Sequence, residues 1–144
     1  MNWKQEAIEK LNNLPAMVIA VDNIPAEIKR LEQEAVQLRG IQPDRLPHTT
    51  PDRGDTPMLN NIVKREELSQ AYDRAKIWVD TTRRAFKVLT EEEQSILMGM
   101  YVNPSYGGVA DLCKKLGLEQ STLYRKREEA LYQFTLALYG ATQQ

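Results

Sequence analysis

Cysteine and histidine are almost absent from this 144-residue chain, which holds one of each, Cys113 and His48. A single cysteine cannot form an intramolecular disulfide, and the two residues together are too few ligands for a His/Cys zinc site. A catalytic triad would need His48, which lies among prolines and threonines in an expected loop. We therefore expect no catalytic residues, no metal and no other cofactor.

Phosphate-binding glycine loops and long apolar runs are also lacking. The sequence has no P-loop pattern and no GxGxxG, and its only glycine pair is Gly107-Gly108. The most apolar stretch, Ala16 to Val21, is far shorter than the roughly 18 residues of a membrane span. The sequence also lacks a basic segment followed by an apolar segment, which would indicate a secretory signal. We expect a cytoplasmic protein that is not an enzyme and has no membrane partner.

Apolar residues recur at helical spacing and no segment alternates with period two, so we predict an all-α fold. A first helix from Trp3 to Leu14 is expected to end at Pro15, and a second to begin at Pro25 and continue to Gly40. Its apolar residues follow the 4-3-4-3 spacing of a coiled-coil-like seam. They are Ile24, Ile28, Leu31, Ala35 and Leu38.

Four prolines and two glycines between Gly40 and Pro57 predict a linker, after which helical spacing returns from Met58 to about Leu89. Ile77 and Trp78 fall outside the main apolar stripe of this long helix, so they either contact another subunit or are covered by the N-terminal helices. The main stripe consists of Leu68, Tyr72, Ala75, Val79, Thr82, Phe86 and Leu89. The predicted organisation is N-terminal helices in a hairpin or coiled-coil-like part (1–39), linker (40–57), long connecting helix (58–88) and C-terminal domain (89–144).

The C-terminal domain is expected to be a helix-turn-helix. Thr90 and Glu93 form a capping box that begins a helix, and Asn103-Pro104 ends it. Two further helices, from Val109 to Leu116 and from Gln120 to Tyr139, are separated by Gly117, and Gly140 stops the last one. Small Cys113 fits the close approach of two helices, and we expect it to be buried.

The last helix has an apolar inner face, formed by Leu123, the stem of Arg127, Ala130, Leu131, Phe134 and Leu138. Its opposite face carries hydroxyls and cations that suit the major groove of DNA, where a guanidinium can contact guanine. We expect Arg125 to read a base, and Lys114 and Lys115 to neutralise phosphates. The full set of predicted DNA-binding residues is Gln120, Ser121, Thr122, Tyr124, Arg125, Lys126, Lys114 and Lys115.

Two segments carry a family resemblance. Residues 89–101, 109–118 and 130–131 resemble region 4 of bacterial sigma-70 factors, and residues 121–134 resemble the C-terminal end of phage-encoded ArpU/RinA-type transcriptional regulators. The chain departs from the family pattern at Glu119, where Ser or Thr is usual, and at Lys126, where sigma factors have an apolar residue. The resemblance implies a sigma-region-4-like helix-turn-helix in a regulator of phage or prophage genes, with double-stranded DNA and RNA polymerase as partners.

Charge does not favour tight DNA binding by a monomer. Residues 88–144 hold five Lys/Arg against seven Asp/Glu, whereas residues 59–87 hold seven against four, with Arg65, Lys76, Arg83 and Lys87 on one helix face. We therefore expect a homodimer, whose C-terminal fold would survive deletion of residues 1–57. Two alternatives are a protein-interaction module that binds RNA polymerase or another regulator, and a phage DNA-packaging protein similar to a terminase small subunit.

Overall fold

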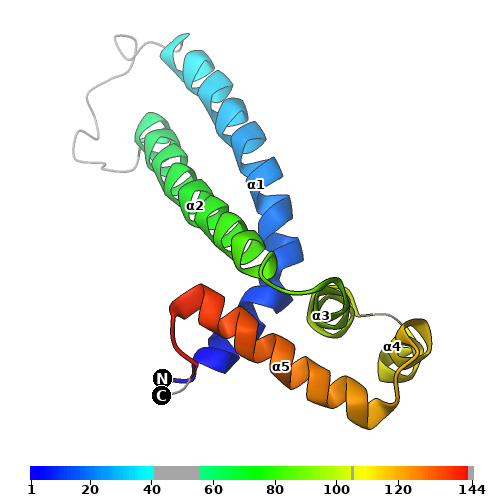
Figure 1. Ribbon diagram of the computed structural model, residues 1–144. Helices are drawn as coiled ribbons and strands as arrows, with labels where there is room; N and C mark the ends of the chain where they lie inside the picture. Colours follow the sequence, from blue (N-terminus) through cyan, green and yellow to red (C-terminus); the bar gives the residue numbers. More distant parts are fainter. Residues whose placement is uncertain (41–55, 105, 143–144) are drawn as a thin grey trace. The chain divides into compact units, whose positions relative to one another are not determined.

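The computed structural model describes residues 1–40, 56–104 and 106–142. Within these ranges the chain is helical and contains no strand, which confirms the all-α prediction. His48 and nearly all of the predicted linker lie outside the described residues. The helices, drawn in Figure 1, are α1 (Trp3–Gly40), α2 (Pro57–Phe86), α3 (Glu91–Leu97), the π-helical segment η2 (Met98–Val102), α4 (Gly108–Leu116) and α5 (Gln120–Tyr139).

The N-terminal segment forms one helix, so the prediction of two helices divided at Pro15 and Pro25 is wrong. Each proline removes one intrahelical hydrogen bond, at a cost of about 3 kcal/mol. Both rings lie on the exposed side of α1, and apolar residues on either side of them are buried, including Leu11 and Leu31. Burial of these flanking residues against other helices offsets the cost, because helices in proteins are stabilised mainly by tertiary packing.

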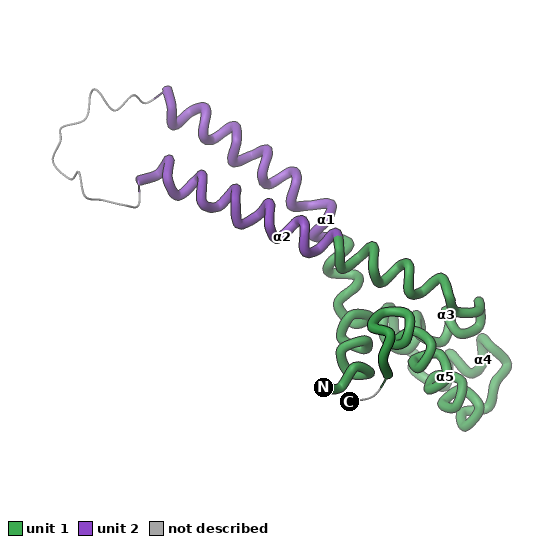
Figure 2. The backbone as a smooth tube through the Cα atoms, turned by 60° about the vertical axis from the view of Figure 1, so that its left-hand side comes forward, with its two compact units in different colours: residues 1–18, 77–144 green, residues 19–76 purple. Residues whose placement is uncertain are grey.

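The chain divides into two compact units, which Figure 2 shows in different colours. Unit 1 comprises Met1–Val18 and Ile77–Gln144, and unit 2 comprises Ile19–Lys76. Each of the two long helices therefore contributes to both units. The first 18 residues belong with the C-terminal helices, an association that the sequence periodicity did not predict.

In unit 2, residues 19–40 of α1 and 57–76 of α2 lie side by side and antiparallel, as Figures 1 and 2 show. The predicted seam of α1 faces inward, with Leu31 and Ala35 buried and the other three residues half-buried. On α2, Ala75 is buried and Leu68 and Tyr72 are half-buried. The heptad spacing thus predicted the buried faces of both helices correctly.

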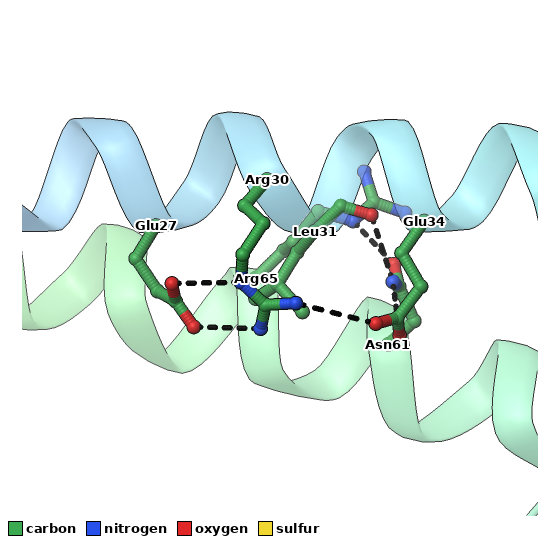
Figure 3. Close-up of polar contacts among 6 residues, drawn as sticks. All are labelled: Glu27, Arg30, Leu31, Glu34, Asn61 and Arg65. Atoms are coloured by element: carbon green, nitrogen blue, oxygen red, sulfur yellow. Dashed lines mark hydrogen bonds and ion pairs between the residues drawn. The ribbon is translucent and has the colours of Figure 1, made fainter.

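A polar network crosses this seam at Asn61, whose residue is 1% exposed (Figure 3). Its Nδ2 donates to the carbonyl oxygen of Leu31 at 2.8 Å and to Oε1 of Glu34 at 3.4 Å, and its Oδ1 accepts from Nε of Arg65 at 2.8 Å. Arg30 extends the network by pairing with Glu27 at 2.8 Å and with Glu34 at 3.4 Å. A buried amide that is satisfied in one alignment only fixes the register of two helices.

Unit 1 has a core to which the ends of the sequence contribute. Ala7 and Leu11 of α1 pack in one buried cluster with Leu131 and Phe134 of α5, and Phe86 meets Phe134 edge to face at 6.0 Å between ring centroids. Trp3 stacks obliquely on Tyr139, with centroids 4.8 Å apart. Without residues 1–18 this core would lose the α1 side chains that pack against α5. The structure therefore does not agree with the expectation that the C-terminal fold survives deletion of residues 1–57.

Trp78 and Ile77 have different surroundings in unit 1. The Trp78 Nε1 donates to the Lys10 carbonyl oxygen at 3.4 Å, and the Lys10 ammonium lies 4.0 Å from the indole centroid. Burial lowers the pKa of Lys10, while neighbouring Glu6 opposes the shift. Trp78 is therefore covered by α1, whereas Ile77 is 65% exposed.

The helix boundaries of the C-terminal part follow the predicted signals. Thr90 and Glu93 form the reciprocal capping box, with the Glu93 amide donating to Thr90 Oγ1 at 3.2 Å. The expected single helix after Thr90 becomes π-helical at Met98, and Gly99 lies in this wider turn. A Cβ at Gly99 would lie 2.9 Å from Cδ1 of Leu112, so glycine permits close packing of η2 on α4.

Candidate nucleic-acid interface

The predicted site residues lie on α4, on α5 and beside the short connection between them. A compact apolar cluster of Ile96, Leu112 and Leu123 joins α3, α4 and α5, and half-buried Cys113 packs against it. Gly117 adopts φ +67° and ends α4, which the glycine signal predicted. This cluster fixes α4 against the first turns of α5. The outer faces of the two helices therefore keep a fixed position relative to each other.

The first turns of α5 present polar side chains to solvent. Gln120, Ser121 and Arg125 are exposed, while Thr122 and Tyr124 are half-buried. Nε2 of Gln120 donates to Oη of Tyr124 at 3.0 Å, and the Arg127 guanidinium lies 4.9 Å from the centroid of the Tyr124 ring. Tyr124 is thus held from both sides. Ser121 and Arg125, four positions apart, are exposed on one face of α5.

The cations of this region differ in their partners. Lys126 forms an ion pair with Glu92 of α3 at 2.5 Å, with a side chain only 30% exposed. Lys115 lies 3.6 Å from Asp111, a longer and more exposed pair one helical turn away. Among the described residues, no ion pair or hydrogen bond is found for the side chains of Lys114 or Arg125, and both are exposed. Of the four predicted cations, these two carry charges that are not locally compensated.

The beginning of α5 offers backbone donors. Glu119 occupies the N-cap position with extended backbone (φ −75°, ψ 156°), and its side chain makes no capping hydrogen bond. The first turn contains no acidic residue. Free amides at a helix N-terminus, together with the helix dipole, suit a phosphate oxygen. Ser121 in the same turn adds a hydroxyl donor.

Three further cations lie at or just after the end of α2, and the sequence had placed two of them, Arg83 and Lys87, on one basic helix face. Arg83, Arg84 and Lys87 are exposed, and the described contacts give their side chains no partner. They are not needed to cap α2, because Nε2 of Gln94 donates to the carbonyl oxygens of Phe86 and Leu89 at 3.1 and 3.3 Å. Arg65 of the same predicted face is instead bound to Asn61.

Acidic side chains cover another part of α5. An open hollow of about 490 Å³ is lined by Glu93, Glu128, Glu129, Tyr132 and Gln133. Hydrogen bonding by Lys4 lowers the pKa of Glu128, with a smaller contribution from Arg127. This surface would repel phosphate, so the end of α5 nearest Gly117 is the part suited to a polyanion.

Within the described ranges, no group of three or more His, Cys, Asp or Glu side chains could hold a metal ion. None of the described helices is long and apolar enough to cross a membrane. Comparisons of the chain with protein-family models, with curated proteins and with solved structures find no match. The residues of the interface are therefore the basis for assigning a function.

Proposed function

We propose that the protein is a cytoplasmic, sequence-specific DNA-binding regulator of phage or prophage genes, and not an enzyme. Its first α5 turns would read the major groove of double-stranded DNA as the second helix of a sigma-region-4-like helix-turn-helix. RNA polymerase is a further partner in this proposal. The observation that carries it is the exposed, uncompensated guanidinium of Arg125, one turn after Ser121 on a helix whose first amides lack a side-chain cap.

Each group has a distinct role in this proposal. Arg125 projects from the outer face and would donate two hydrogen bonds to O6 and N7 of a guanine. Ser121 and the first amides of α5 would contact one phosphate, and Lys114 another. Lys126 would contribute little, because Glu92 already neutralises its ammonium.

Charge limits the affinity of one copy. Unit 1 contains ten Lys/Arg and ten Asp/Glu residues, so it lacks the basic excess that drives non-specific binding. Two copies on adjacent half-sites would multiply the affinity without a more basic surface. We therefore include a homodimer in the proposal.

The direct test is selection of bound duplexes from a random-sequence library, followed by a salt titration of the selected duplex. DNA binding predicts an enriched motif and a linear fall of log affinity with log salt. Arg125→Ala should relax the preference at one base pair, at a cost of about 1–3 kcal/mol. Arg74→Ala, which removes the same charge from an exposed position of unit 2, is the matched control.

Equal weakening of all sequences by Arg125→Ala would make this residue a phosphate contact and contradict its assignment to a base. Absence of any enriched motif would contradict sequence-specific recognition, and an affinity for duplex that does not fall with salt would contradict DNA binding itself. Lys114→Ala should weaken binding uniformly and reduce the salt slope by about one unit.

A second candidate function is a protein-interaction module. The observation that favours it is the acidic hollow around Tyr132, which is 52% exposed and suited to a basic segment of RNA polymerase or another regulator. Glu129→Lys would then abolish capture of that partner, and the wild type would show no steep fall of its affinity for duplex DNA with salt.

A further inference from the structure

One flank of the unit 2 helix pair is apolar and uncovered. On α2, Leu59, Ile62 and Val63 are 43%, 45% and 46% exposed, and on α1 Val36 is 66% exposed. We call these four residues the apolar flank. Isolated exposed apolar side chains are ordinary, but four of them at the same end of one helix pair form a patch.

A groove lies on the side of the pair to which Ile62 contributes. It has a volume of about 420 Å³ and is lined by Ile28 and Glu32 of α1 and by Ile62, Arg65 and Glu66 of α2, among others. Val36 stands one turn after Glu32, and Leu59 one turn before Ile62, so both continue the groove toward the same end of the pair. Val63 follows Leu59 by four positions and widens this surface.

The opposite flank is polar and internally satisfied. Glu27, Arg30 and Glu34 form the ion-pair network that Asn61 joins (Figure 3). The flank with the groove carries charged side chains as well, but it also exposes the four residues of the apolar flank at one end of the pair. A contiguous apolar patch of this kind is typical of a surface that another protein covers.

Charge and dimensions favour a second copy of this chain as the cover. The groove carries both signs, with Glu32 and Glu66 beside Arg65, so it suits a surface of the same mixed composition better than a polyanion or a uniformly basic peptide. Helices of about 20 residues are about 30 Å long, and a pair about 20 Å wide would bury about 600 Å² per copy, or about 1,200 Å² in total. That area reaches the lower limit of stable protein interfaces.

From these observations we infer that two copies of the protein associate through the apolar flank, so that two helix pairs form a four-helix bundle. Ile62 lies at the centre of the contact, with Leu59 and Val36 extending it. Association of this kind gives each helix a second buried stripe, which a lone pair cannot provide. The inference does not depend on DNA binding, because association is measured without DNA.

Sedimentation equilibrium of the full chain tests the inference over a concentration range up to about 50 µM, with circular dichroism as a check on folding. The wild type is expected to approach twice the 16.5 kDa of one chain. Ile62→Lys should raise the dimer dissociation constant at least about tenfold, because it replaces an apolar side chain at the centre of the contact by an ammonium that must lose its hydration there. Ile77→Lys is the matched control, since Ile77 lies on the same helix and is 65% exposed outside the flank.

Both variants are expected to keep the helical content of the wild type, because Ile62 and Ile77 are 45% and 65% exposed. With folding unchanged, a lower average mass reports a loss of association. A wild type that stays monomeric at the highest concentration would overturn the inference. So would a dimer that Ile77→Lys weakens as much as Ile62→Lys does, because the interface would then lie elsewhere.

Discussion

The hydroxyl of Thr82 is buried in unit 1 and has no hydrogen-bond partner among the described residues. An unsatisfied buried polar group costs about 1–3 kcal/mol, and valine has nearly the same shape without the hydroxyl. Thr82→Val should therefore raise the free energy of unfolding by about 1 kcal/mol, as measured by urea denaturation. Few substitutions stabilise a protein, so the sign of the change is informative.

Thr135 provides a control for this prediction. It is also buried, but its Oγ1 donates to the Leu131 carbonyl oxygen at 2.6 Å. Thr135→Val removes a satisfied hydroxyl and should bring no gain in stability. Equal stabilisation by both substitutions would indicate that added hydrophobicity, and not the missing partner of Thr82, is the cause.

The ion pair between Lys4 and Glu128 predicts a dependence on pH. The Lys4 ammonium lies 2.5 Å from Oε1 of Glu128 and lowers the pKa of this carboxyl, so the pair stabilises the fold above the ordinary pKa of glutamate and loses this effect as the pH falls through the lowered value. Both side chains are nearly half exposed, so Lys4→Met should cost less than about 0.5 kcal/mol at pH 7.

Unfolding curves of wild type and Lys4→Met across acidic pH check this expectation. The difference between them should shrink toward zero below about pH 4, where glutamate is protonated in the unfolded chain. A difference that persists at the lowest pH would instead reflect packing of the lysine stem.

Gly117 illustrates how one backbone conformation shapes a pair of helices. Its φ of +67° is unfavourable for residues with a Cβ, although a Cβ there would meet no atom within 4 Å. Gly117→Ala should lower the free energy of unfolding by about 1–2 kcal/mol, and Gly117→Asn by less, since asparagine tolerates this conformation. Equal losses for the two variants in urea denaturation would contradict a purely conformational cause.

Local signals predicted most helix ends and buried faces. Thr90, Gly117 and Gly140 act on their own neighbours, and heptad spacing marks the side of a helix that will be buried. Pro15 and Pro25 misled the prediction, because the packing that keeps α1 continuous comes from residues distant in sequence. The π-helical turn at Met98 had no recognised signal.

The candidate interface was predictable in outline but not in its charges. The spacing of residues on α5 correctly placed Ser121 and Arg125 on the exposed face. The sequence did not show that Glu92 neutralises Lys126 in an ion pair, because these residues are 34 positions apart and meet only when α3 packs against α5. Long-range ion pairs therefore decide which cations remain for a ligand.

At the scale of the whole molecule, α1 serves two cores. Leu11 is fully buried in unit 1 and Leu31 is 1% exposed in unit 2. Leu11→Ala should cost about 2–5 kcal/mol and speed hydrogen exchange of α5 amides, whereas Leu31→Ala should speed exchange in residues 57–76 of α2. Exchange in α5 that responds equally to both substitutions would mean that the chain unfolds as one cooperative unit.

The contact of Trp3 with Tyr139 has a consequence for the order of events on the ribosome. The apolar side of early α1, with Ala7 and Leu11, is synthesised long before Leu131 and Phe134, against which it packs. Folding of unit 1 must therefore wait until α5 has emerged, because non-local contacts form only when both partners exist. During that interval the apolar side of early α1 has no partner to pack against, while residues 19–40 and 57–76 of unit 2 can already form their helix pair.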